Sequence, residues 1–132
     1  NAGFPAPVTA WADAIRAADG VIITSPEYNW TIPGGLKNAI DWTSRIKEDP
    51  FKGKPVALQS CAGGLLGGWR MQYHLRQGLL SVESEVMIRP EVFVSFAPKK
   101  FDEKLELIDQ PTKDMLKLQL EAFEKFIRHC KR

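Results

Sequence analysis

A short apolar run that ends at a Ser-Pro pair constrains the fold more than any other stretch of the chain. Residues 21–24 read Val-Ile-Ile-Thr, without alternation of apolar and polar positions, which is typical of a strand buried on both faces of a parallel sheet. Pro26 ends this strand, because proline has no N–H to donate to a sheet ladder. A polar loop follows, and Pro33 suits the first turn of a helix. Such a strand–loop–helix junction lies at the carboxyl edge of an α/β sheet, where ligands bind.

Helical and strand patterns alternate along the rest of the chain. Apolar residues recur three and four positions apart in the helical stretches, and short apolar runs bounded by Gly and Pro form the strands. This alternation predicts an α/β fold, in which helices cover both faces of a parallel sheet. Pro90 interrupts the third strand region, so we expect a bulge or an edge position there. The expected elements are helices over about 9–20, 33–43, 69–80 and from 111 onward, and strands over 21–24, 56–60 and 85–96.

The same patterns predict local details of packing. Pro5 and Pro7 favour an extended opening, Thr9 is a candidate N-cap of the first helix, and Gly20 is its expected C-terminal stop. Trp42 is typical of a core residue. In the last helix the apolar stripe expected to face the sheet consists of Leu116, Leu120, Phe123 and Ile127.

The length and the charge balance indicate an ordinary globular domain. The chain has 132 residues, of which 44% are hydrophobic and 26% charged, so we assign residues 1–132 to a single domain. The formal net charge of +2 gives no reason to expect nucleic acid or a membrane as a partner. No apolar run approaches the roughly 20 residues of a membrane-spanning helix. Cys61 and Cys130 are too few for a disulfide framework, which favours a reducing cytoplasm.

An ordered set of motifs gives the chain a specific resemblance. The motifs are Pro-Glu-Tyr-Asn at 26–29, Pro-Gly at 33–34, Leu-Lys-Asn-Ala-Ile-Asp-Trp at 36–42, Gly-Lys-Pro at 53–55, a glycine-rich loop that runs to Arg70, His-Leu-Arg-Gln at 74–77 and Pro-Glu-Val at 90–92. In this set the chain resembles the NAD(P)H-dependent FMN reductase family, the flavodoxin-like reductases of quinones, azo dyes and chromate. The similarity runs in register over nearly the whole chain.

The resemblance implies a flavodoxin-like three-layer sandwich with the strand order 2-1-3-4-5. In that family a strand–helix–strand unit comes first, and its first loop holds the FMN phosphate. This chain opens at Asn1, without methionine and without such a loop, so we expect that the first βαβ unit is absent and the domain N-terminally incomplete. The resemblance also implies a homodimer or homotetramer with the active site near the subunit contact. A charged network across that contact would use Arg70, Tyr73, Arg76 and Glu91.

The loop after the first strand is the first candidate site. By resemblance, Pro26, Glu27, Tyr28 and Asn29 contact FMN. Main-chain N–H groups and the Asn29 amide would reach the ring edge, where negative charge develops on reduction, and Tyr28 would cover one face. Trp30 would line the mouth where nicotinamide and acceptor stack. The residues alone leave open a second interpretation, an exposed strand-to-helix turn rich in polar residues.

The glycine-rich loop at 61–68 is the second candidate site. By resemblance, Ser60, Cys61, Gly63 and Gly64 contact the other side of the flavin. Free amides and the N-terminus of the following helix would stabilise negative charge there. The alternative is a flexible connection, although two leucines beside four glycines argue against plain flexibility. Cys61 would need a lowered pKa and a nearby base to act as a nucleophile, so we expect a small buried residue instead.

Three functions are compatible with these features. The first is an FMN-dependent NAD(P)H oxidoreductase that passes hydride from nicotinamide to flavin and on to a quinone, azo or metal-oxyanion acceptor, with no catalytic side chain. The second is a truncated non-enzymatic relative that acts as an oligomer or partner subunit without bound flavin. The third is a flavodoxin-like electron carrier, which the slightly basic charge disfavours because such carriers are usually acidic. His74 and His129 have no second ligand at metal-binding spacing, so we expect no metal site.

Overall fold

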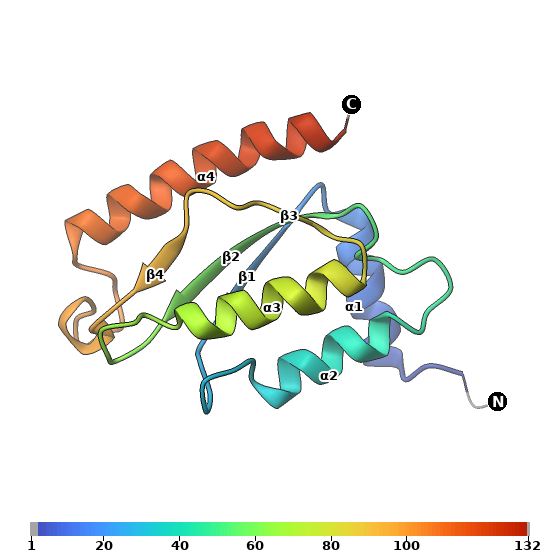
Figure 1. Ribbon diagram of the computed structural model, residues 1–132, viewed down its shortest axis with the longest axis horizontal. Coiled ribbons are helices and arrows are strands. Elements are labelled where there is room, and N and C mark those ends of the chain that lie inside the picture. The colour runs from blue at the N-terminus through green and yellow to red at the C-terminus, as the bar shows by residue number, and fades with distance from the viewer. Residues whose placement is uncertain (1–2, 132) are drawn as a thin grey trace.

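The computed structural model describes residues 3–131, which form three layers (Figure 1). A parallel sheet forms the middle layer. Helices α1 (Ala6–Ala17), α2 (Gly34–Thr43) and α3 (Trp69–Ser81) cover one face of the sheet, and α4 (Gln110–Cys130) lies on the other face. The predicted α/β fold, with helices on both sides of a parallel sheet, is confirmed.

The sheet has one central strand with a neighbour on each side. Ser25, at the end of the first strand, lies opposite Ser60 on the central strand, so both strands finish at the same edge. The third strand is broken into two parts that both pair in parallel with the central strand, and Pro90 lies in the break, as predicted. The strands are β1 (Val21–Ser25), β2 (Pro55–Cys61), β3 (Glu85–Val86) and β4 (Val92–Val94).

Alternating residues of β2 face the two helical layers. Val56 and Leu58 belong to the core under α1, α2 and α3, whereas Ala57 contacts Phe123 of α4. Burial of one large apolar side chain contributes about 1.5–3 kcal/mol, so the larger cluster dominates the stability of the fold. The larger cluster consists of Ile15, Ile23, Ile40, Phe51, Val56, Leu58, Met71, Leu75, Leu79 and Val82.

None of the described helices is both long and apolar enough to cross a membrane.

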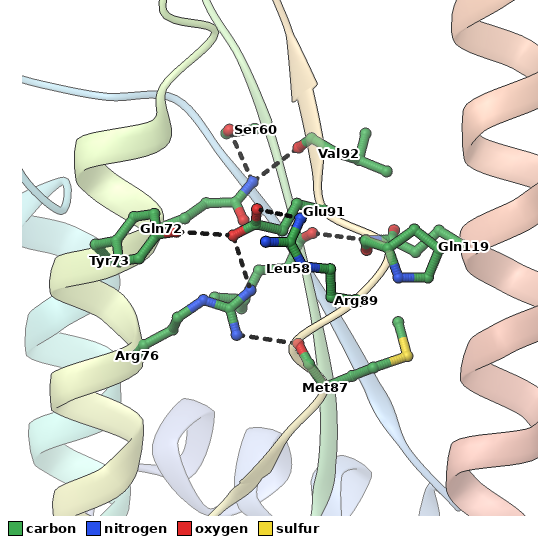
Figure 2. A network of polar contacts seen from close by, with 11 residues as sticks. Leu58, Ser60, Gln72, Tyr73, Arg76, Met87, Arg89, Glu91, Val92 and Gln119 are labelled. Atoms are coloured by element: carbon green, nitrogen blue, oxygen red, sulfur yellow. Dashed lines mark hydrogen bonds and ion pairs between the residues drawn. The ribbon is translucent and has the colours of Figure 1, made fainter.

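Two buried glutamines satisfy carbonyl groups around the break in the third strand (Figure 2). The amide of Gln72, on α3, donates to the carbonyl of Val92 at 2.8 Å. From the opposite layer, the amide of Gln119 on α4 donates to the carbonyl of Pro90 at 2.9 Å. A buried carbonyl without a partner costs about 1–3 kcal/mol, so both side chains support the interrupted strand.

β1 is not buried on both faces, in contrast to the prediction. Ile23 and Ser25 are buried, but Ile22 is 41% exposed and Thr24 is exposed too. The cause is the position of α4, which packs on β2 and β4. Within residues 3–131 the face of β1 that carries Ile22 therefore stays open to solvent.

The start and the end of α1 also differ from the prediction. The helix begins directly after Pro5, and Pro7 lies in its first turn, where a missing N–H has no cost, so the opening is not extended as far as Pro7. Thr9 lies inside the helix and is not its N-cap. The helix ends at Ala17, before Gly20. Gly20 instead allows close packing, because a Cβ there would lie 2.7 Å from the Ile127 side chain of α4. Residues 1 and 2 of the opening lie outside the described residues.

Two residues expected in the core are exposed. Trp42 is 41% exposed and meets the ring of Phe4 edge to face, with 6.4 Å between the centroids. Leu120 is 48% exposed, and the neighbouring Gln119 is buried in its place. The buried face of α4 therefore includes Gln119 rather than Leu120, because the sheet needs the Gln119 amide. Hydrophobic spacing does not reveal this polar requirement.

Candidate functional site

The two predicted ligand loops lie side by side at the carboxyl edge of the sheet. β1 and β2 are adjacent and parallel, and their last residues, Ser25 and Ser60, are paired. The loop at 26–31 and the glycine-rich loop at 61–68 therefore begin next to each other. This is the place where open α/β sheets bind ligands.

The first loop is a tight hairpin. Tyr28 and Thr31 exchange main-chain hydrogen bonds of 3.1 and 3.0 Å. The two residues between them have a left-handed backbone conformation, with φ values of 48° at Asn29 and 70° at Trp30, as in a type I′ turn. A left-handed tryptophan is unusual, because a bulky side chain costs roughly 1–2 kcal/mol there. The sequence carries no signal for this hairpin, because the usual signal for this turn is Asn-Gly, and glycine is absent here.

The tip of this hairpin points its polar and aromatic groups outward. The side chains of Tyr28 and Trp30 are 60% and 68% exposed. In the described part of the chain, the main-chain N–H groups of Asn29 and Trp30 donate to no other group, and the Asn29 amide has no partner. These groups are available to a ligand.

The glycine-rich loop presents a second set of free donors. Two of its carbonyls accept hydrogen bonds, since the N–H groups of Ala97 and Phe96 donate to the carbonyls of Ala62 and Gly64, respectively, at 3.1 Å each. The N–H groups of Gly63 and Gly64, by contrast, donate to nothing within residues 3–131. A Cβ at either glycine would meet no atom within 4 Å, so the space in front of them is open. Free adjacent amides that face open space can bind a negatively charged group.

The last two glycines of this loop have a different task. Gly67 and Gly68 have φ values of +58° and +86°, and a Cβ at Gly68 would lie 2.8 Å from the Cβ of Ser60. The Ser60 hydroxyl donates to the Gly67 carbonyl at 2.6 Å and accepts from Gln72 at 2.9 Å. Ser60 is fully buried, and these contacts fold the loop back onto β2.

The side chain of Glu27 points to α3. One carboxylate oxygen accepts from the N–H of Met71 at 3.2 Å, and the other lies 3.1 Å from the guanidinium of Arg70. The Glu27 side chain is only 13% exposed. The carboxylate is thus engaged with the helix that follows the glycine-rich loop.

Two further contacts join the hairpin to α3. The guanidinium of Arg70 lies 4.1 Å from the ring centroid of Trp30, a cation–π distance. A ring nitrogen of His74 lies 2.8 Å from the hydroxyl of Thr31. The prediction of a structural or interface role fits His74, whereas the stacking of Arg70 on Trp30 carries no signal in the sequence.

Cys61 does not have the features of a nucleophile. Burial raises the pKa of the Cys61 thiol, and the nearby Lys100 cation opposes this only in part. A raised pKa leaves less thiolate at neutral pH.

Within the described residues no group of three or more His, Cys, Asp or Glu side chains could hold a metal ion.

Three of the four residues expected at a subunit contact, Tyr73, Arg76 and Glu91, contact one another within one chain (Figure 2). The Tyr73 hydroxyl donates to Glu91 at 3.1 Å, and Arg76 and Arg89 lie 4.0 and 3.5 Å from the same carboxylate. Burial lowers the pKa of Arg76, and the charge of Glu91 opposes this. Arg70 instead pairs with Glu27. The subunit contact itself stays a prediction.

A comparison with protein families agrees with this geometry. The family model described as NADPH-dependent FMN reductase matches residues 1–99, which include both loops. The chain belongs to the NADPH-dependent FMN reductase family. It is therefore an oxidoreductase, and its cofactors are FMN and NAD(P)H.

Other members of the FMN reductase family are similar over nearly the whole chain. The quinone reductase of Escherichia coli K12 is 52% identical over 130 residues, which are 98% of this chain and 69% of that protein. The NAD(P)H-dependent FMN reductase of Pseudomonas aeruginosa is 41% identical over 129 residues, covering 98% and 70%. The solved structure of FerB, a flavoenzyme NAD(P)H:(acceptor) oxidoreductase from Paracoccus denitrificans, superposes with a TM-score of 0.86 at 32% identity, over 95% of this chain and 69% of that one. The flavodoxin-like fold is confirmed.

The two loops offer the kind of group that the ring of the cofactor needs. A flavin needs hydrogen-bond donors at its pyrimidine edge. The free N–H groups of Gly63 and Gly64 and the unpaired amide of Asn29 lie on the two adjacent loops. Family membership favours the reductase interpretation over the non-enzymatic alternative.

Proposed function

We propose that this protein is an FMN-dependent NAD(P)H oxidoreductase that reduces a quinone, with azo compounds and metal oxyanions as further acceptors. The observation that carries the proposal is the set of free donors, at Asn29, Gly63 and Gly64, on two loops that adjacent parallel strands bring together. When bound, FMN supplies the redox chemistry, because it accepts hydride from NAD(P)H and returns electrons to a second substrate. The protein's part is to bind the ring and to leave one face open.

The two loops divide the work of holding the ring. The N–H groups of Gly63 and Gly64, beside the N-terminus of α3, would donate to the edge that becomes negatively charged on reduction. Asn29 would donate from the hairpin. Ser60 and Glu27 support these loops from behind, because their side chains are already engaged by protein groups. The proposed cofactor-binding set includes both the residues that would touch the ring and those that support the loops without touching it, and consists of Pro26, Glu27, Tyr28, Asn29, Ser60, Cys61, Gly63 and Gly64.

Aromatic side chains at the mouth would receive the two substrates in turn. Tyr28 and Trp30 are the most exposed aromatic residues of the described chain, and both belong to the hairpin. A nicotinamide and a quinone are both flat rings that stack on such surfaces. No acid or base is assigned, because hydride transfer between two cofactor rings does not require one.

The quaternary structure and the compartment belong to the same proposal. A homodimer or homotetramer would place the subunit contact near this site, and size-exclusion chromatography with light scattering tests the oligomeric state. Cys61 and Cys130 are both free, which suits a reducing cytoplasm. The acceptor is a small molecule, and neither nucleic acid nor a membrane is proposed as a partner.

The experiment measures NAD(P)H oxidation with benzoquinone, together with the dissociation constant of FMN, in wild-type protein and in Asn29→Ala and Gly64→Ala. Both variants are expected to bind FMN at least tenfold more weakly, because Asn29→Ala removes an amide donor and Gly64→Ala puts a Cβ into the open space that the ring would occupy. The control is Gly78→Ala, because Gly78 also has open space for a Cβ but lies within α3, away from the loops. Unchanged FMN affinity in Asn29→Ala and Gly64→Ala would contradict the site assignment. Absence of NAD(P)H oxidation in FMN-loaded wild-type protein would contradict the activity.

A further inference from the structure

Helix α3 begins without a cap of its own. Its N-cap residue is Gly68, which has no side chain to bond the first N–H groups of the helix. Met71 is the third residue of the helix, and its N–H is the donor that an N-cap side chain usually satisfies. Here the acceptor is the Glu27 carboxylate, at 3.2 Å, which comes from the loop after β1. The cap of α3 is thus supplied by a different element.

The second oxygen of the same carboxylate makes an ion pair. It lies 3.1 Å from the Arg70 guanidinium, and the two side chains are 13% and 26% exposed. Arg70 in turn lies over the ring of Trp30. A partly buried pair at a helix N-terminus is stronger than a surface pair, because the helix dipole favours the carboxylate and water screens it less. The Glu27 carboxylate therefore contacts α3 directly and, through Arg70, supports the strained hairpin.

The position of this carboxylate is between the two ligand loops. Glu27 directly precedes the hairpin, and α3 directly follows the glycine-rich loop. The two backbones approach closely here, since a Cβ on Gly68 would lie 3.8 Å from the Cβ of Glu27. A contact at this point fixes the separation of the hairpin from the amides of Gly63 and Gly64.

We propose that Glu27 is a positioning residue, which sets the width and the electrostatics of the flavin site by capping α3 from the hairpin loop. It acts through Met71 and Arg70 rather than through contact with the flavin or a substrate. This inference rests on the proposed function, because it assumes that FMN lies between the two loops. Its negative charge also offsets the positive end of the α3 dipole, so removal of the charge would favour the reduced, more negative cofactor.

The test compares Glu27→Ala and Glu27→Gln in the complete protein. Alanine removes both contacts, and FMN affinity is expected to fall at least tenfold. Glutamine keeps an oxygen that accepts from the Met71 N–H, so its affinity is expected to stay within about threefold of wild type, since a neutral amide side chain also accepts hydrogen bonds. The loss of charge in Glu27→Gln is expected to shift the midpoint potential of bound FMN to less negative values, which a purely structural role would not do.

The matched control is Lys54→Met, which removes another tertiary helix cap. The Lys54 ammonium donates to the carbonyls of Arg16 and Ala18 at the C-terminal end of α1, at the opposite edge of the sheet. FMN affinity in Lys54→Met is expected to match wild type. If Glu27→Ala binds FMN as wild type does, or if Glu27→Gln leaves the potential unchanged, the inference is wrong while the proposed function stands. Wild-type protein that binds no FMN would contradict the proposed function itself.

Discussion

The side-chain amide of Gln119 on α4 donates to the main-chain carbonyl of Leu58 on β2, at 3.1 Å. The same nitrogen donates to the carbonyl of Pro90, and the amide oxygen accepts from Gln59 at 3.0 Å. One fully buried side chain thus satisfies three polar groups at the break in the third strand. A leucine of similar size would fill the space and leave all three groups without their partner.

We therefore expect Gln119→Leu to lower the free energy of unfolding by about 2–4 kcal/mol, because each buried polar group left unsatisfied costs about 1–3 kcal/mol and a leucine returns part of that by apolar burial. Urea unfolding followed by circular dichroism measures this change. The control is Leu118→Gln on the exposed face of the same helix, where the expected change is below about 0.5 kcal/mol. A cost below about 0.5 kcal/mol for Gln119→Leu would show that the amide network does not support the strand.

The glycines of the loop at 61–68 are expected to differ sharply in their tolerance of alanine. Gly68→Ala puts a Cβ 2.8 Å from that of Ser60 at a φ of +86°, so we expect a loss of about 2 kcal/mol or more. Gly64→Ala meets no atom within 4 Å, and its free energy of unfolding is expected to stay within about 0.5 kcal/mol of wild type. Thermal unfolding of the FMN-free proteins compares the two. Equal losses would mean that the loop has a different conformation in solution.

Trp30→Gly is expected to separate stability from catalysis. Glycine relieves roughly 1–2 kcal/mol of left-handed strain, but the variant loses about 0.5–1 kcal/mol of contact with Arg70 and gains unfolded-state entropy. These effects nearly cancel, so the free energy of unfolding is expected to change by less than about 1 kcal/mol. The kcat/KM for a quinone is expected to fall at least fivefold, with Trp30→Phe retaining most of the activity. Full activity in Trp30→Gly would remove this residue from the acceptor site.

Asp109 is expected to make the fold sensitive to acid. Hydrogen bonds from Thr112 and the nearby Lys100 cation hold the pKa of the Asp109 carboxyl below its usual range, and Asp109 caps α4 through the Thr112 N–H. A carboxyl with a lowered pKa in the folded state stabilises the fold above its unfolded pKa of about 4 and loses this contribution as the pH falls further.

The measurement is urea unfolding of wild type and Asp109→Asn, at about pH 5 and about pH 3, on either side of that unfolded pKa. Asparagine also caps helices, so the variant is expected to fold, and its stability should fall less steeply between the two pH values. Parallel losses in the two proteins would show that Asp109 is not coupled to folding.

The sequence was most informative where the physics is local. Apolar runs bounded by glycine and proline placed the strands, and Pro90 marked the break in the third strand. The position of the two ligand loops at one sheet edge followed from the parallel topology. The motifs alone were enough to identify the residues of those loops as candidates for the site.

The remaining features depend on tertiary contacts that no spacing encodes. Gln119 is buried because β2 and the broken strand need its amide, although its neighbours suggest that Leu120 should face inward. Glu27 reads as a loop residue, yet it caps a helix that begins more than forty positions later. The exposure of Trp42 depends on how α2 meets the opening segment. At Gln119 and Glu27, polar satisfaction rather than hydrophobic pattern decides the position of the side chain.

The most direct test of the flavin site is the absorbance spectrum of the purified protein during titration with FMN, followed by anaerobic addition of NAD(P)H and then of a quinone. We expect saturable binding with perturbed flavin bands, bleaching of those bands by NAD(P)H and their return when the quinone is added. A protein that is colourless once unbound FMN has been removed by gel filtration, and that consumes no NAD(P)H, would show that the two loops do not hold a flavin.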